Sequence, residues 1–364
     1  MCKKNKHIAN KILLSFSVRR NFTMNLHFFK TVFAVALVAG AGYFFGCSSE
    51  KAPEVENNTL VNVSYDPTRE FYSNYNHIFM KHWKEATGKD VKITQFHGGS
   101  GKQALEVVNG LEADVVTLAL EYDVNIIRDA GLIENGWVKE FPHNSAPYTS
   151  TIVFLVRKGN PKKIKDWNDL VKDGIGIITP NPKTSGGARW NYLAAWAYAE
   201  KLFNGDEEQV KGFMKKLYKN VLDLASGARG STNTFIEERK GDVLLSWENE
   251  AFLSLKDYPK DYEIVMPSVS VLAEPSVAIV DKIVDKRNTR KLATEYLNYL
   301  YSDEAQHVAA RHHYRPTNKS ILDEYKEFDQ NVNLITIEHF GGWENAQKTH
   351  FSEYGIFDQI YEKN

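Results

Sequence analysis

Short apolar runs alternate along the chain with segments whose apolar residues recur at helical spacing. After the first run, at residues 60–63, one apolar face follows that is typical of an amphipathic helix. That face consists of Phe71, Tyr75, Ile78, Phe79 and Trp83. Residues 190–203 are apolar on almost every side, which predicts a buried helix. Further strands are predicted at residues 91–96, 114–118, 175–178, 243–247 and 263–266. This alternation predicts α/β layers with mainly parallel sheets.

Two more apolar runs, 150–156 and 276–280, lie where a two-domain chain would cross from one domain to the other and back. We interpret them as hinge strands. The length of 364 residues, with 43% apolar and 25% charged residues, fits a globular protein of two ordinary domains. The sequence therefore predicts a lobe I made of residues 59–150 and about 281–364, and a lobe II made of residues 151–280.

The N-terminal segment has the pattern of an export signal. Its first 46 residues carry seven basic residues and no acidic one, and an apolar run at 32–45 is too short to span a bilayer comfortably. With small residues before Cys47, this predicts a lipoprotein-type signal peptide over 1–46 and a lipid on Cys47. Because such signals usually have about 15 to 30 residues, Met24 is the expected true start. The polar residues 47–58 are interpreted as a tether.

Cysteine content bears on disulfides, and net charge bears on the class of ligand. Cys2 and Cys47 are the two cysteines of the sequence, so the predicted mature chain has no pair for a disulfide. Without residues 1–46 the chain has 45 − 7 = 38 basic against 46 acidic residues, a net charge near −8. That charge argues against a nucleic-acid partner, and an anionic ligand would have to be bound by local donors.

Four loops place small residues directly before a predicted helix, where free backbone N–H groups and the helix dipole favour an anion. They are Asp66-Pro67, HGGSGK at 97–102, TSGGAR at 184–189 and SGARGS at 226–231. The second is not a P-loop, because Phe96 and Gln103 stand where that motif needs Gly and Ser or Thr. Taken alone, Asp66-Pro67 and Trp247 are better explained by ordinary capping and core packing, and the other three loops are explained about equally well by structure or by ligand binding.

The loops belong to longer motifs that occur in a fixed order: VSYDPTREFY, HGGSGKQ, EADVVTLALEYD, ITPNPKTSGGARWNYLAAW, SGARGSTNTF and WENEA. With them the chain resembles the periplasmic sulfate-binding protein family from about Leu60 to the C-terminal FGGW and FDQI segments. The resemblance implies a two-lobed, type II-like periplasmic binding protein. Each lobe would be a mainly parallel sheet flanked by helices, and two hinge strands would join the lobes.

The resemblance also implies the site, because this family holds dehydrated sulfate in its cleft by hydrogen bonds alone, without metal, cofactor or salt bridge. At the matching positions the ligand-binding residues are Asp66, Ser100, Ser185, Gly186, Gly187, Ala228 and Trp247. The donors would be backbone N–H groups, the hydroxyls of Ser100 and Ser185, and the indole of Trp247. Sulfate only accepts hydrogen bonds, whereas a phosphate that carries a proton would point an O–H at a donor.

Partners and location follow from the same resemblance. We expect the permease subunits of an ABC importer as protein partner, a place outside the cytoplasmic membrane with the lipid on Cys47 as anchor, and a monomer. Thiosulfate and molybdate or tungstate remain alternative ligands because each is also a tetrahedral dianion.

Two other classes of function fit the sequence less well. A serine hydrolase would use Ser100 or Ser185 with His97 as base, but neither serine lies in a Gly-x-Ser-x-Gly elbow. Metal binding would rest on eleven histidines, of which His312 and His313 are adjacent. Adjacent histidines on a helix do not easily face one ion, so we expect no metal site. Without a nucleophile elbow we also expect that the protein is not an enzyme.

Overall fold

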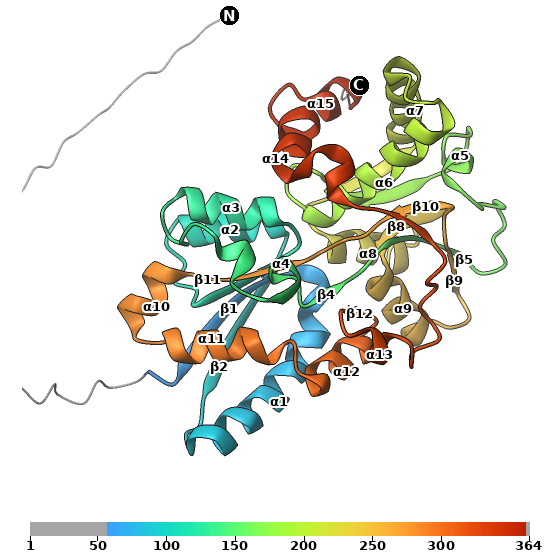
Figure 1. The fold of residues 1–364 in the computed structure, drawn as a ribbon. Coiled ribbons are helices and arrows are strands. Elements are labelled where there is room, and N and C mark those ends of the chain that lie inside the picture. Colours follow the sequence, from blue (N-terminus) through green and yellow to red (C-terminus); the bar gives the residue numbers. More distant parts are fainter. Residues whose placement is uncertain (1–56, 362–364) are drawn as a thin grey trace, which may run out of the picture. The chain divides into compact units, whose positions relative to one another are not determined.

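Two β-sheets organise residues 57–361, the part of the chain that the computed structural model describes (Figure 1). The first sheet has the strand order β11-β3-β1-β2 and the second the order β7-β6-β8-β5-β9. Two smaller sheets pair β12 with β4 and β10 with β13. The predicted signal peptide 1–46, Cys47 and most of the predicted tether fall outside the described residues.

The first sheet is mainly parallel, as predicted. Its strands are β1 (Thr59–Tyr65), β2 (Lys92–Gly98), β3 (Val115–Leu118) and β11 (Ser276–Ile279). β1 is parallel to both neighbours, with Val63 opposite Phe96 on one side and Val116 on the other. β11 returns antiparallel to β3. Helices α1 (Arg69–Thr87) and α2 (Ser100–Val108) make the two parallel crossovers, so β1 and β3 are largely buried.

Helix α1 confirms the predicted amphipathic face. Phe71, Tyr75, Phe79 and Trp83 are buried, and the helix ends where Gly88 adopts a left-handed conformation with φ 74°. The aromatic residues of α1 pack against rings from the C-terminal half of the chain, as Phe79 does on Tyr296 at a centroid distance of 4.9 Å. Segments far apart in the sequence therefore share one core.

The second sheet departs from the predicted parallel arrangement. Its strands are β5 (Ile152–Arg157), β6 (Ile177–Pro180), β7 (Val221–Ala225), β8 (Val243–Trp247) and β9 (Tyr262–Val265). β6 is parallel to β7 and β8, but β5 is antiparallel to β8 and β9. β5 enters this sheet directly from the first part of the chain, so no helical crossover sets its direction.

Four longer helices accompany the second sheet: α6 (Gly186–Leu202), α7 (Glu207–Lys219), α8 (Ala228–Ile236) and α9 (Glu248–Asp257). α6 is buried on almost every side, as its sequence predicts. It lies between α7 and strand β10 (Val269–Val271) and also contacts the second sheet, which removes nearly its whole surface from water.

The chain passes between the two sheets close to strand β4 (Tyr148–Thr149), which pairs with β12 (Arg315–Pro316). Just beyond β4, Ser150 exchanges both backbone hydrogen bonds with Ala273, each at 2.9 Å. The outgoing and returning segments are thus tied to each other. The division into lobes at residues 151 and 280 stays a prediction.

The remaining elements complete the layers. Four short elements precede the second sheet in the sequence: η1 (Asp66–Thr68), α3 (Glu121–Asp129), η2 (Trp137–Lys139) and α4 (Pro142–Ser145). Helix α5 (Trp167–Leu170) lies between strands β5 and β6 in the sequence. After it come α10 (Asp281–Arg287), α11 (Arg290–Tyr299), α12 (Asp303–Arg311), α13 (Lys319–Leu322), β13 (Asn333–Ile335), η3 (Ile337–Phe340), α14 (Gly342–Ala346), η4 (Gln347–Phe351) and α15 (Ile356–Ile360). The last of these pack beside α6 and α7, where Phe357 meets Tyr218 at 5.2 Å (Figure 1).

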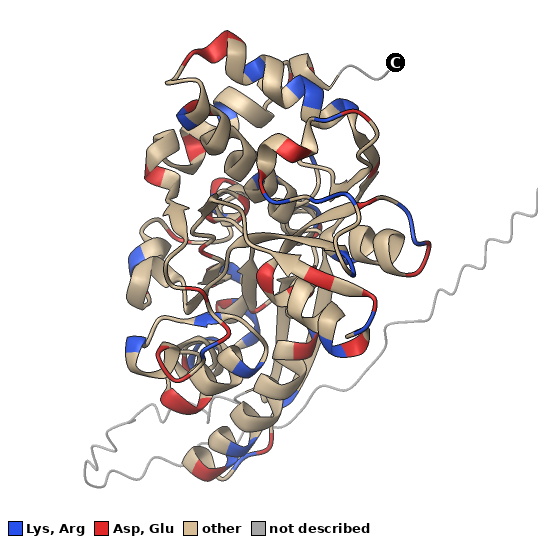
Figure 2. Ribbon diagram, turned by 90° about the vertical axis from the view of Figure 1, so that its right-hand side faces the viewer, with Lys and Arg blue, Asp and Glu red and all other residues tan. Residues whose placement is uncertain are grey.

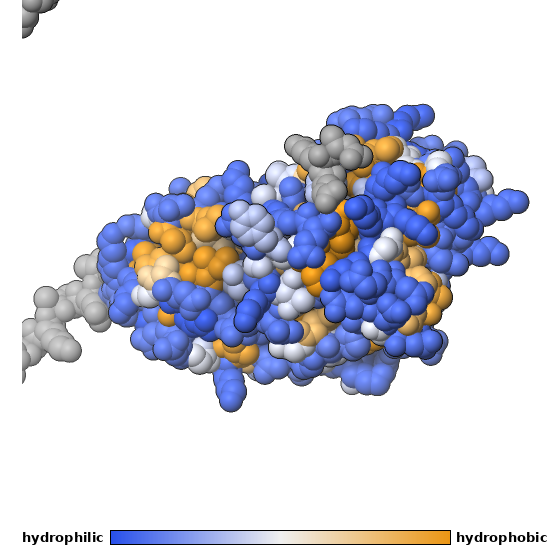
Figure 3. All heavy atoms as spheres, turned by 90° about the horizontal axis from the view of Figure 1, so that it is seen from above, coloured by the Kyte–Doolittle hydropathy of each residue, from blue (hydrophilic) through white to orange (hydrophobic). Residues whose placement is uncertain are grey.

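The outer face is mixed in character. Acidic and basic residues are interspersed over helices and loops (Figure 2). Seen from above, the surface is mostly hydrophilic with separate apolar patches (Figure 3). Within residues 57–361, no helix combines the length and the apolar character that a membrane crossing requires.

Candidate functional site

The seven predicted ligand-binding residues line one small cavity between the two sheets. The lining residues are Tyr65, Asp66, Pro67, Gly98, Gly99, Ser100, Ala119, Ser185, Gly186, Gly187, Ala228 and Trp247. None of them is Lys, Arg or His. A larger crevice lies between α1 and α9, but none of the seven lines it. Its size is no argument for it, since a single tetrahedral ion needs a small, closely fitted space.

The carboxyl ends of strands from both sheets lead into this cavity. β1, β2 and β3 of the first sheet end just before Asp66, Gly99 and Ala119, and β8 of the second sheet ends at Trp247. In open α/β sheets, loops at the carboxyl ends of strands are the usual place for a ligand. The fold therefore brings together loops that lie up to about 180 residues apart in the sequence.

Three helices begin at the cavity wall. α2 starts at Ser100, α6 at Gly186 and α8 at Ala228, and the short helix η1 starts at Asp66. The first N–H groups of a helix have no partner within it, and the helix dipole adds positive potential there. Convergence of several such ends makes the cavity suited to an anion without any cationic side chain.

Ser185 stands directly before helix α6 as its N-cap. Its Oγ accepts a hydrogen bond from the backbone N–H of Ala188 at 3.4 Å. This bond uses a lone pair of the hydroxyl and leaves its proton available as a donor. Ser185 is buried and lines the cavity, so a ligand there is an available acceptor for that proton.

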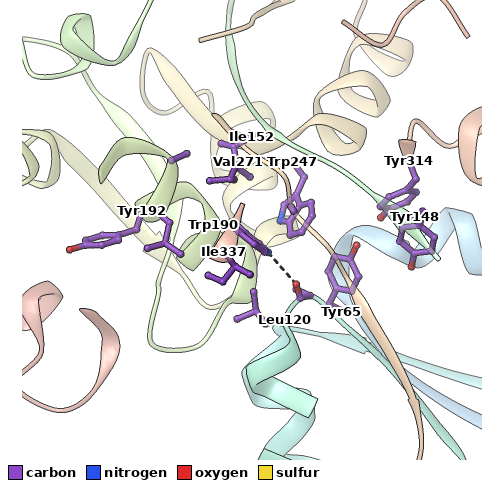
Figure 4. Packing of buried hydrophobic residues seen from close by; sticks show 14 of the residues in the cluster. Tyr65, Leu120, Tyr148, Ile152, Trp190, Tyr192, Trp247, Val271, Tyr314 and Ile337 are labelled. Atoms are coloured by element: carbon purple, nitrogen blue, oxygen red, sulfur yellow. Dashed lines mark hydrogen bonds between the residues drawn. The ribbon is translucent and has the colours of Figure 1, made fainter. Parts of the chain in front are cut away.

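Trp247 carries a buried donor at the cavity. Its side chain is 1% exposed, and Nε1 has no hydrogen-bond partner among the described residues. The indole lies against the ring of Tyr65 at a centroid distance of 5.4 Å (Figure 4). A Cβ at Gly187 would lie 2.2 Å from Nε1, so only glycine lets the backbone approach the indole so closely. Because buried N–H groups are nearly always paired, this orphan donor indicates a ligand position.

Ser100 differs from the expectation for its hydroxyl. Its Oγ donates to Oδ2 of Asp123 at 2.5 Å and accepts from the backbone N–H of Ala119 at 3.0 Å. The single hydroxyl proton is therefore engaged inside the protein. The backbone N–H of Ser100, at the start of α2, has no partner within the helix, and Ser100 lines the cavity. Asp123 in turn binds Arg189 at 3.0 Å, and this ion pair is almost fully buried.

Carboxylates near the cavity are each matched by an arginine. Asp66 accepts from Arg69 at 3.3 Å. Arg229, next to Ala228, donates to Glu70 of α1 at 2.9 and 3.1 Å and to Glu250 of α9 at 2.8 and 3.1 Å. Burial alone would raise the pKa of Glu70, but the bonds to Arg229 outweigh it and lower that pKa. Because Glu70 and Glu250 share one arginine, these pairs offset only part of the negative charge that would otherwise repel an anion.

Comparison with known proteins agrees with this geometry. Residues 70–315 match the family described as bacterial extracellular solute-binding protein. The sulfate-binding protein of Escherichia coli is 57% identical over 323 residues, which cover 88% of this chain and 97% of that protein. The thiosulfate-binding protein of Pseudomonas aeruginosa is 46% identical over 338 residues, or 92% and 100%. The chain belongs to the periplasmic sulfate-binding protein family.

A solved structure supports the family fold. The sulfate-binding protein SubI from Mycobacterium tuberculosis superposes with a TM-score of 0.72 at 28% identity, covering 80% of this chain and 99% of that one. The α/β fold of a periplasmic binding protein, predicted from the sequence, is confirmed. Proteins of this family bind a solute for transport without transforming it, so the chain is not an enzyme.

The geometry offers no support to the hydrolase alternative. Nδ1 of His97 lies 3.4 Å from the carbonyl oxygen of Tyr65 and from Oγ1 of Thr68, not beside either candidate serine. Burial lowers the pKa of His97 to about 4. For the metal alternative, no group of three or more His, Cys, Asp or Glu within residues 57–361 is arranged to hold an ion.

Sequence reasoning missed several residues that build the site: Tyr65, Ala119, Asp123 and Arg189. All four lie inside motifs of the family resemblance. Their residue types carried no signal, because each acts through a partner that is distant in the chain. Asp123, in the first turn of α3, offered the one local hint, since a charged residue that becomes buried requires a partner.

Proposed function

We propose that the protein captures sulfate outside the cytoplasmic membrane and delivers it to an ABC importer. The observation that carries this proposal is the convergence of all seven predicted residues on one cavity that has donors but no cation. The 57% identity to a sulfate-binding protein supports the same ligand.

Sulfate fits a site made of donors. The ion would accept hydrogen bonds from the first N–H groups of α2, α6, α8 and η1, from the Ser185 hydroxyl and from Nε1 of Trp247. Hydrogen bonds to a charged group contribute about 1.5 to 3 kcal/mol each, so a handful of them exceeds the cost of ordering the ligand. A protonated phosphate would leave one donor facing an O–H and should bind poorly.

Closure of two lobes around the ion is part of the proposal. The donors come from loops of both sheets, and those loops touch each other. A Cβ at Gly99 would lie 2.7 Å from the carbonyl oxygen of Ser226 and 2.8 Å from that of Thr184. Since Gly99 follows a first-sheet strand and the other two belong to second-sheet loops, a hinge near Ser150 and Ala273 would open and close the cavity.

Calorimetric titration tests the ligand. Purified mature protein should bind sulfate with micromolar or tighter affinity and phosphate at least 100-fold more weakly, by the donor argument above. Thiosulfate is the second candidate, because a relative named thiosulfate-binding protein is 46% identical. Molybdate and tungstate complete the panel. Tighter binding of thiosulfate than of sulfate would change the assigned ligand, and binding of no oxyanion would refute the proposal.

A lipid on Cys47 would hold the protein at the membrane, as the residues before Cys47 suggest. A single acyl chain gives weak binding, so the multiple chains of a lipoprotein would be needed for stable anchoring. Cys47→Ser should lose the lipid mass and leave the membrane fraction or remain unprocessed. An unchanged mass and unchanged fractionation would contradict tethering.

A further inference from the structure

A second tryptophan connects the two sheets next to the cavity. Trp190 is fully buried in helix α6, on the second-sheet side. Its Nε1 donates to the carbonyl oxygen of Ala119 at 3.2 Å, the dashed bond in Figure 4. Ala119 follows β3 of the first sheet and lines the cavity, whereas Trp190 does not. This hydrogen bond therefore spans the two sides without belonging to the donor set.

Ala119 is also hydrogen-bonded to Ser100. Its backbone N–H donates to Oγ of Ser100 at 3.0 Å, so Ala119 is held through both its N–H and its carbonyl oxygen. The start of α6 fits tightly here, since a Cβ at Gly186 would lie 2.8 Å from Cβ of Ala119 and 3.2 Å from Cβ of Ser100. Trp190 is thereby linked to the loop that presents the Ser100 N–H to the cavity.

We propose that Trp190 is a positioning residue for anion capture, which holds the Ala119 and Ser100 loops in place when the two sides close. The bond from Nε1 to Ala119 can form only while the two sheets are together. When they separate, water can hydrate both groups. A bond made only in the closed form raises the affinity for whatever stabilises that form. This inference rests on the proposed binding of sulfate.

The chain offers a matched control in Trp167. Its side chain is also fully buried, and its Nε1 donates to the carbonyl oxygen of Val269 at 2.8 Å. Each indole has an edge-on aromatic neighbour: Trp190 meets Trp343 at 4.6 Å and Trp167 meets Phe154 at 4.7 Å. Trp167 in α5 and Val269 in β10 both lie within the predicted lobe II, so opening should not break the bond between them.

The test compares Trp190→Phe with Trp167→Phe. Loss of the Trp190 donor leaves the Ala119 oxygen unpaired only in the closed form, so sulfate affinity should fall by about 5- to 150-fold. The change should appear mainly as faster dissociation, because the bond forms after encounter. Trp167→Phe leaves Val269 unpaired in both forms. It should lower the melting temperature while sulfate affinity stays within about twofold.

An NMR readout uses the unmodified side chain. In protein with ¹⁵N-labelled indole groups, sulfate should shift the Trp190 N–H resonance and slow its hydrogen exchange, while the Trp167 resonance stays unchanged. This measurement decides the question even if Trp190→Phe fails to fold, because the other six tryptophans can be assigned with their own Phe variants.

Failure of the inference differs from failure of the proposed function. If wild-type protein does not bind sulfate, the function is wrong. If wild-type protein binds sulfate but Trp190→Phe binds it equally well, with a loss of stability like that of Trp167→Phe, Trp190 only packs the core. An insensitive Trp190 resonance would overturn the inference in the same way.

Discussion

Replacement of Trp247 by Phe should remove one donor from the proposed sulfate site. The indole is 1% exposed and lies against Tyr65, and its Nε1 has no partner among residues 57–361. Phe keeps an aromatic ring in that position but carries no N–H. One sulfate oxygen would then lose a hydrogen bond worth about 1.5 to 3 kcal/mol, which corresponds to a 10- to 150-fold loss of affinity.

Stability without ligand should respond differently. The smaller ring leaves a cavity and loses packing, which is destabilising. The same change also removes a buried donor that has no protein partner, and an unpaired donor costs about 1 to 3 kcal/mol. These effects oppose each other, so the free energy of unfolding of the unliganded protein should change less than the free energy of binding.

Titration calorimetry with sulfate and thermal unfolding without it measure the two quantities. Gly187→Ala is a useful companion variant, because its Cβ would lie 2.2 Å from Nε1 and would displace the indole. It should weaken binding at least as much as Trp247→Phe. The reasoning fails if Trp247→Phe destabilises the unliganded protein while sulfate affinity stays within about threefold.

Three further outcomes are expected. Glu70→Gln removes a charged partner of Arg229 across the two sheets and should speed sulfate dissociation about 2- to 10-fold. The control Glu85→Gln, on the exposed side of α1, should leave the rate unchanged. Equal dissociation rates for both variants in stopped-flow kinetics would show that the Arg229–Glu70 pair contributes nothing. Saturating sulfate should reduce the radius of gyration, and identical scattering profiles would exclude substantial closure. Sulfate affinity should not change between about pH 5 and 8. The melting temperature of the unliganded protein should nevertheless fall from about pH 6.5 towards pH 4, because burial lowers the pKa of His97, His312 and His350 to about 4 and the unfolded chain therefore takes up protons first. A melting temperature that does not change with pH in this range would contradict those shifts.

Local patterns predicted the elements well where the chain forms regular layers. The run at 243–247 is strand β8, and the aromatic face of α1 is buried as expected. The direction of β5 was not predictable in this way. Apolar periodicity shows that a strand is buried but not which neighbour it joins, and β5 joins a sheet that is completed by residues some 90 to 110 positions later.

The candidate site shows the same boundary between local and long-range information. Glycine and serine before a helix indicate a free helix end, so the loops at 97–102 and 184–189 could be found from sequence. The fate of the Ser100 proton could not, because it depends on Asp123 and, behind it, on Arg189. The role of each donor therefore remains a prediction, whereas the cavity that all seven residues line is a feature of the structure.

The reliance on helix ends has a consequence for how such a site would appear in mutagenesis. Main-chain donors are not removed when a side chain is truncated to alanine, and Ala228 is already alanine. An alanine scan would therefore report large effects at Trp247 and at crowded glycines such as Gly187, and would pass over the main-chain donor of Asp66. Proline, which removes an N–H, or a backbone ester would be the informative replacement. Positions such as Ala228, whose proposed contribution is a main-chain N–H, could change their side chain while the ligand is retained, provided that the loops kept their shape.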